Sequence, residues 1–100
     1  MAVRQTNVFA VAPENMEAFV ALIPEARRLI EKHGGTLRVW QATVAGPNSG
    51  NILGQTELDS MTAYGAFTDA LNADPDFMAL TQKGAALGTV VSVILSTELE

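Results

Sequence analysis

Few side chains in this sequence are of the types that perform chemistry. There is no cysteine, so disulfides and thiolate metal sites are excluded, and His33 is the single histidine. No acidic pair is spaced for acid–base work on one buried face, and no nucleophile–histidine signature is present. The glycine-containing stretch 46–51 has the composition of a turn and no helix follows it, so it is not a phosphate loop. We therefore expect neither a metal nor a cofactor.

The remaining candidates are polar or aromatic side chains within apolar stretches. Asn7 interrupts an apolar strand, and it either contacts a bound molecule or is satisfied by backbone or water at a sheet edge. Trp40, the only tryptophan, either forms the floor of an aromatic pocket or anchors the core or an interface. Arg38 shares the strand face of Trp40. If that face is buried, its guanidinium needs a carboxylate from a ligand or from Glu57 across a hairpin.

Two aromatic residues and the histidine fall within predicted helices. Tyr64 and Phe67 are three residues apart, a spacing typical of a helix face that packs on a core. The Tyr64 hydroxyl could in addition orient a substrate. His33 is expected at a helix C-terminus, where the dipole favours a cation, and we interpret it as a surface residue.

The elements that must position these residues are organised around the stretch 36–58. It contains two runs that favour strands, joined by the polar loop 46–51, and this pattern predicts a hairpin in which the first strand extends to Val44. Residues 3–11 and 89–97 have the composition of two further strands.

Helices are expected before and after the hairpin. An apolar stripe predicts a helix from Pro13 to about His33, closed by glycines, with a kink or break at Pro24. A second helix should begin after Ser60, end near Asn72, and restart at 74–75, where aspartate can cap and proline can fill the first turn.

The order strand, helix, strand, strand, helix, strand has one favoured arrangement. With right-handed crossovers it gives an α+β, ferredoxin-like βαββαβ fold, a four-stranded antiparallel sheet with its helices on one face. One hundred residues form a single domain, residues 1–100.

The face of the sheet without helices is expected to be unusually apolar. We place Trp40, Val90 and Ile94 on it, together with Phe9. Exposed apolar surface costs about 25 cal/mol per Å², and only 17% of the residues are charged. A two-fold homodimer that apposes two open faces is the simplest way to bury this surface.

Charge and hydropathy limit the other partners. The net charge is −5 and the basic residues form no long cluster, which argues against nucleic acid. No apolar run reaches the length of a membrane span, and the N-terminus lacks the pattern of a signal peptide. We expect no membrane association and a location in the cytoplasm.

Four short motifs carry a resemblance to a known group of proteins. They are Gly34-Gly35, the turn 45–50, the segment 57–64 and the segment 74–77. With them the chain resembles, over nearly its whole length, the dimeric α/β-barrel superfamily, near the NIPSNAP-like and antibiotic-biosynthesis-monooxygenase-like families. The resemblance implies a homodimer whose sheets together enclose a cavity. Members include cofactor-free oxygenases of aromatic polyketides, haem-degrading enzymes, muconolactone isomerases and chlorite dismutase relatives.

The resemblance also implies roles for some residues. Relatives orient substrate or oxygen with an asparagine, in some cases on the first strand, and Asn7 occupies a similar place. The second helix walls the cavity in relatives. The tryptophan of the oxygenase relatives lies elsewhere, so no catalytic role carries over to Trp40. Residues 61–83 contain no histidine, cysteine or second tyrosine, which argues against haem. The substrate-binding candidates are Asn7, Phe9, Arg38, Trp40, Tyr64 and Phe67.

The expected function is therefore a homodimer that binds a small molecule, with cofactor-free monooxygenase-like or isomerase activity on a small aromatic or carboxylated compound. The alternative is a non-catalytic binding or structural dimer, and haem binding or degradation is the least favoured hypothesis.

Overall fold

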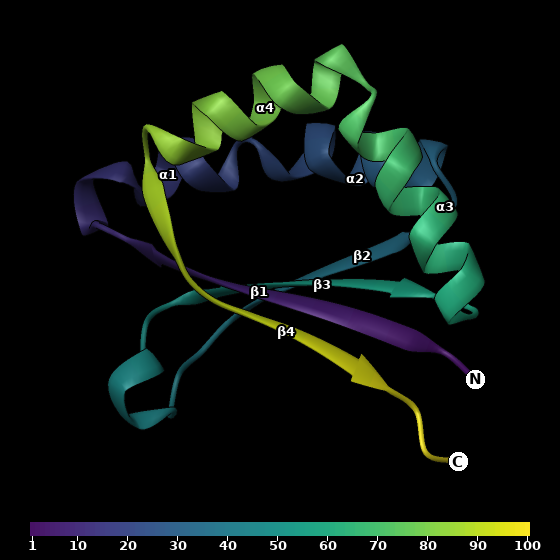
Figure 1. Cartoon of the computed structure of the whole chain (residues 1–100). Coiled ribbons are helices and arrows are strands. Elements are labelled where there is room, and N and C mark those ends of the chain that lie inside the picture. Colours follow the sequence, from purple (N-terminus) through teal and green to yellow (C-terminus); the bar gives the residue numbers. More distant parts are fainter.

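The computed structural model describes residues 1–100, apart from the side chain of Asn48. Four strands form one antiparallel sheet in the order β2-β3-β1-β4 (Figure 1). They are β1 (Val3–Val11), β2 (Thr36–Gln41), β3 (Ile52–Leu58) and β4 (Gly88–Thr97). This strand order confirms the ferredoxin-like α+β fold.

The helices lie on one face of the sheet (Figure 1). They are α1 (Met16–Val20), α2 (Ile23–Lys32), α3 (Met61–Asn72) and α4 (Pro75–Ala85), with two 3-10 turns, η1 (Pro13–Asn15) and η2 (Gly46–Asn48). Helix α2 packs on β2 and against α4. The opposite face of the sheet carries no helix.

The predicted interruption of the first helix is confirmed. Helix α1 ends at Val20 and α2 begins at Ile23, so Pro24 lies in the first turn of α2, where its missing N–H costs nothing. After α2, Gly34 adopts a φ of 98°, a left-handed conformation that ends the helix and turns the chain into β2. The predicted restart of the later helix at Asp74 is also confirmed.

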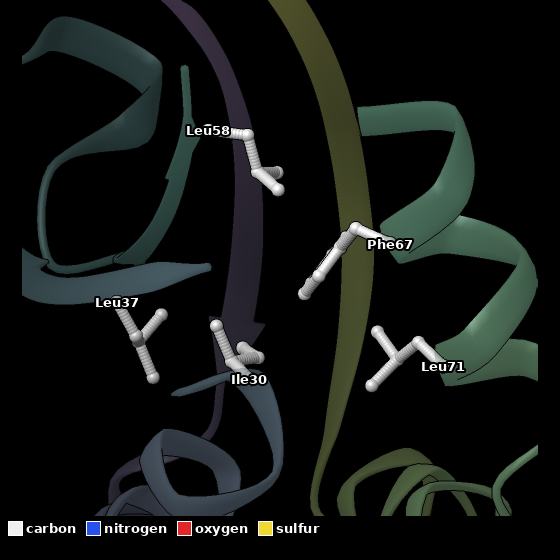
Figure 2. Packing of buried hydrophobic residues seen from close by; sticks show 5 residues of the cluster. All are labelled: Ile30, Leu37, Leu58, Phe67 and Leu71. Atoms are coloured by element: carbon white, nitrogen blue, oxygen red, sulfur yellow. The ribbon is translucent and has the colours of Figure 1, made fainter. Parts of the chain in front are cut away.

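The core lies between the sheet and the helices. Figure 2 shows five of its side chains, which come from two strands and two helices and point toward one another: Ile30, Leu37, Leu58, Phe67 and Leu71. Residues directly opposite one another across the strands share a face. Asn7 faces Gly54 and Val93, and it lies on the side that the helices cover.

Two predictions about the sheet are wrong. The first hairpin strand ends at Gln41, so Val44 lies in the connecting loop. In addition, the register between β1 and β4 shifts after Val8, and this irregularity brings Val90 opposite Phe9, on the helix side. Simple alternation along β4 cannot reveal such a shift. The open face therefore keeps Trp40 and Ile94 but not Phe9 or Val90.

Candidate functional site

A cavity of about 530 Å³ lies between the sheet and helices α1, α2 and α4. Its floor comes from all four strands: Asn7, Phe9, Leu37, Val39, Ile52, Gly54, Thr56, Gly88, Thr89 and Val90. The helices supply the remaining walls: Phe19, Leu22, Ile23, Ala26, Ile30, Phe77, Leu80, Thr81, Gly84 and Ala85. Its size and largely apolar lining are typical of sites that bind small molecules.

The lining is electrically neutral. None of the lining residues named above has a side chain that is charged at neutral pH. Its polar groups are the Asn7 amide and three threonine hydroxyls, and Thr81 already donates to the carbonyl of Phe77 (2.9 Å). A ligand that carries a full charge would lose its hydration here without gaining a counter-ion. The cavity therefore favours neutral, apolar molecules.

A glycine lies beside Asn7 on the cavity floor. Gly54 is the cross-strand partner of both Asn7 and Val39. The nearest atom to a Cβ built at Gly54 would be Cε2 of Phe9, at 3.5 Å, an ordinary van der Waals contact. Gly54 thus adds no side chain of its own beside Asn7, and the edge of the Phe9 ring borders this position. The backbone of β3 and the Phe9 ring form a smooth floor next to the Asn7 amide, a surface that suits a flat molecule.

The Asn7 amide is held by a chain of hydrogen bonds. Gln5 lies two residues earlier on the same face of β1, and its Nε2 donates to Oδ1 of Asn7 (2.9 Å). Tyr64, in the first turn of α3, donates its hydroxyl proton to Oε1 of Gln5. Within the part of the chain that the structure describes, Nδ2 of Asn7 has no protein partner, and Asn7 lines the cavity. The amide thus presents its N–H groups to the cavity.

Gln5 is a residue that the sequence analysis missed. The signal was available, because Gln5 and Asn7 are separated by two positions and must share a strand face. What the sequence alone does not reveal is that Tyr64 reaches the same point from a helix 59 residues away.

Arg38 and Trp40 lie on the opposite face of the sheet from Asn7. Their cross-strand partners are Gln55 and Leu53, and the Trp40 Nε1 donates to Oε1 of Gln55 (3.1 Å). The predicted pair between Arg38 and Glu57 is absent from the described residues, since Glu57 binds Arg4 (3.0 Å). These two candidates therefore do not share a cavity with Asn7, and any role in binding concerns the open face.

The other aromatic candidates are divided between the cavity and the core. Phe9 lines the cavity, and its ring lies 5.2 Å from that of Phe19, measured between centroids. Phe67 belongs to the core cluster, and Tyr64 packs against it. Of the six predicted residues, the structure places Asn7 and Phe9 at the cavity and connects Tyr64 to it through Gln5.

A separate polar cluster joins the end of α2 to the start of α4. Asp74 is buried, and its carboxylate accepts hydrogen bonds from Nε2 of His33 (2.8 Å), Nζ of Lys32 (3.2 Å) and the backbone N–H of Asp76 (2.9 Å). These donors, His33 first, hold the pKa of Asp74 far below its usual range. The interpretation of His33 as a surface residue is wrong, because only 17% of its side chain is exposed. No group of side chains in the described part of the chain is suited to hold a metal ion.

Comparisons with known proteins identify the fold. A scan against models of protein families finds no match, and a search of curated proteins finds none either. Among solved structures, a NIPSNAP domain protein from Burkholderia xenovorans matches with a TM-score of 0.77 and 15% identity, over 98% of this chain and 94% of that one. The protein Rv0793 from Mycobacterium tuberculosis matches with a TM-score of 0.74 and 14% identity, over 100% and 97% of the two chains.

A third match is an enzyme. SnoaB, a cofactor-independent oxygenase from Streptomyces nogalater, matches with a TM-score of 0.68 and 18% identity, over 99% of this chain and 94% of that one. The resemblance to NIPSNAP and antibiotic-biosynthesis-monooxygenase-like proteins is therefore confirmed at the level of the fold. At these identities the likeness concerns the fold alone. Among the described residues, no helix is both long and apolar enough to cross a membrane.

Proposed function

We propose that this chain is a homodimer that binds a small, neutral aromatic molecule in the cavity between sheet and helices and oxidises it without a cofactor. The observation that carries the proposal is the oriented Asn7 amide in a largely apolar cavity of about 530 Å³. A carboxylated ligand, the other class considered, is less favoured because the lining supplies no cation. The fold shared with a cofactor-independent oxygenase supports the proposal.

In the proposed reaction O₂ is the only oxidant. A CH₂ group of the bound molecule becomes a carbonyl: one oxygen atom stays on the carbon, and the other leaves as water with the two hydrogens. Asn7 would donate a hydrogen bond to a substrate oxygen on which negative charge develops, and such donors lower the barrier most in dry sites. Since no side chain of the lining is a general base, the substrate must itself be acidic enough to lose the first proton.

The absence of a base in the lining favours a second candidate function. A cavity of this kind could hold a ligand without changing it, which would make the chain a binding or structural dimer. Haem is the least favoured ligand, since neither histidine, cysteine nor tyrosine is among the lining residues. O₂ consumption distinguishes the enzyme from the binding module.

The test compares the wild-type chain with Asn7→Ala against a panel of polycyclic aromatic ketones and phenols. Calorimetry should show binding that the substitution weakens about five- to tenfold, the value of one neutral hydrogen bond. An oxygen electrode should show turnover that falls by a larger factor, because the bond strengthens as charge develops.

Asn72→Ala is the matched control, since it makes the same change at an exposed position at the end of α3. Binding without O₂ uptake would favour the binding module over the enzyme. If no compound of the panel binds, or if both substitutions have the same effect, the proposed function is wrong.

The proposed dimer is supported by exposed apolar side chains on two strands. Trp40 of β2 and Ile94 of β4 are each about half exposed and lie on the open face. The exposed apolar residues Val90, Val93 and Leu95 of edge strand β4 lie on the helix side and do not belong to this face. A second copy could cover the open face around Trp40 and Ile94, since burial of apolar area drives such association.

A further inference from the structure

We propose that Tyr64 and Gln5 are positioning residues that fix the orientation of the Asn7 amide, so that the cavity selects ligands with a hydrogen-bond acceptor. This inference deepens the proposed function and rests on it, because it concerns the same cavity. It assigns a role to two side chains that do not line the cavity themselves.

An asparagine amide has two nearly isosteric ends, an oxygen that accepts and an NH₂ group that donates. Which end faces the cavity decides whether a ligand must accept or donate. An isolated asparagine could turn over and serve either kind of ligand. At Asn7 the choice is removed by a neighbour, because Nε2 of Gln5 donates to Oδ1 and so occupies the accepting end.

Gln5 could itself turn over, so its orientation also needs a cause. Tyr64 provides it by donating its hydroxyl proton to Oε1 of Gln5, which leaves the glutamine nitrogen directed at Asn7. All three side chains are partly buried, so water competes only weakly for these bonds. Tyr64 is in turn anchored by α3, whose first turn is capped by the Ser60 hydroxyl accepting from the N–H of Ala63 (3.1 Å).

The consequence is a preference for one ligand chemistry. The cavity presents N–H donors at Asn7 beside Gly54, and its walls are otherwise largely apolar. A planar molecule with a carbonyl or quinone oxygen on its edge satisfies this donor. A molecule of the same shape that offers only an N–H leaves two donors facing each other, which is costly in a largely apolar cavity.

Three rigid tricyclic probes of nearly equal shape test this preference: fluorenone carries an acceptor oxygen, carbazole carries an N–H donor, and fluorene carries neither. Calorimetry on the full chain should show fluorenone binding about five- to tenfold more tightly than fluorene, with carbazole the weakest. In Tyr64→Phe, which removes only the hydroxyl, the advantage of fluorenone should shrink to about twofold or less, while fluorene binds as before. In Asn7→Asp the order of fluorenone and carbazole should reverse, because the cavity then faces an oxygen.

We call the hydrogen-bonded series Tyr64–Gln5–Asn7 the relay. Thr68→Val is the matched control, since it removes another hydroxyl of α3 that does not belong to the relay. The ligand-free proteins provide a second readout, the side-chain NH₂ resonances of Asn7 in an ¹⁵N spectrum. Tyr64→Phe should shift them, whereas Thr68→Val should not.

A wild-type preference for carbazole, or an Asn7 resonance indifferent to Tyr64→Phe, would overturn the relay. If no probe binds but the resonance shifts as expected, the relay stands and the proposed binding function fails. A uniform loss of affinity for all three probes in Tyr64→Phe would indicate a purely structural role and would also overturn the inference.

Discussion

At the scale of single residues, Asp74 is a buried carboxylate surrounded by three hydrogen-bond donors. One buried carboxylate caps α4 and accepts bonds from two side chains at the end of α2. Its pKa lies below that of the unfolded chain, which is about 4, so the charge stabilises the folded state at pH values above about 4. This contribution is lost progressively as the pH falls below that value.

The prediction concerns Asp74→Asn, which keeps a capping oxygen but removes the charge. Near neutral pH the variant should unfold at a clearly lower urea concentration than the wild type. The difference in the urea midpoint should narrow as the pH falls below about 4. Urea titrations over a pH series at one protein concentration measure this directly. The exposed Asp69 provides the control Asp69→Asn, which should follow the wild-type curve. If the urea midpoints of Asp74→Asn and the wild type differ by the same amount at every pH, the charge of Asp74 is not the source of the stabilisation.

At the scale of elements, the approach of α2, β3 and α3 depends on one glycine. A Cβ at Gly35 would lie 2.9 Å from Cγ2 of Ile30, 3.0 Å from Cε1 of Phe67 and 3.1 Å from Cγ2 of Thr56. Three side chains, one from each element, would have to give way to make room. Gly65, in the middle of α3, is exposed and has no atom within 4 Å of such a Cβ.

We therefore expect alanine substitutions at the two glycines to change the free energy of unfolding in opposite directions. Gly35→Ala should lower the free energy of unfolding by about 1–3 kcal/mol through overpacking. Gly65→Ala should raise it by about 0.5–1 kcal/mol, since alanine loses less backbone entropy in a helix. Denaturant unfolding of both variants checks the pair, each serving as the control for the other. Equal effects would mean that the contacts around Gly35 do not limit the packing.

The helices and strands could largely be predicted from the sequence, but the side of the sheet on which each residue lies could not. Turn residues, caps and apolar spacing are local signals, so the break near Pro24 and the restart at Asp74 could be predicted, and the order of strands and helices along the chain indicated the fold. The register shift that places Val90 opposite Phe9 depends on pairing between distant strands, which no local pattern reports. Asn7 and Phe9 could be named as candidates from their residue types. That the sheet separates them from Trp40 could not be predicted, because it depends on how distant strands pair and on which face the helices cover.

At the scale of the whole molecule, the composition of the open face bears on whether two copies of the chain associate. It is less apolar than the sequence suggested, because one row across it contains Arg4 and Glu57 and another contains Arg38. Its exposed apolar groups lie over β2 and the edge strand β4. Substitutions on β4 can therefore distinguish the two faces of that strand, since Ile94 is opposite Thr6 on the open face and Leu95 is opposite Gln5 on the helix side.

The last prediction is that Ile94→Asp dissociates the proposed dimer. Two-fold symmetry would bury two unpaired carboxylates, so the dissociation constant should rise on the order of 100-fold or more. Light scattering coupled to gel filtration should give twice the 10.6 kDa of one chain for the wild type, and a mass near that of one chain for the variant. Val44→Asp places the same charge in a loop position that is 95% exposed and should leave the dimer intact. A wild-type mass of one chain would exclude the dimer. Dissociation by Leu95→Asp but not by Ile94→Asp would move the interface to the other side of β4, because only the helix-side residue would then be buried between the copies.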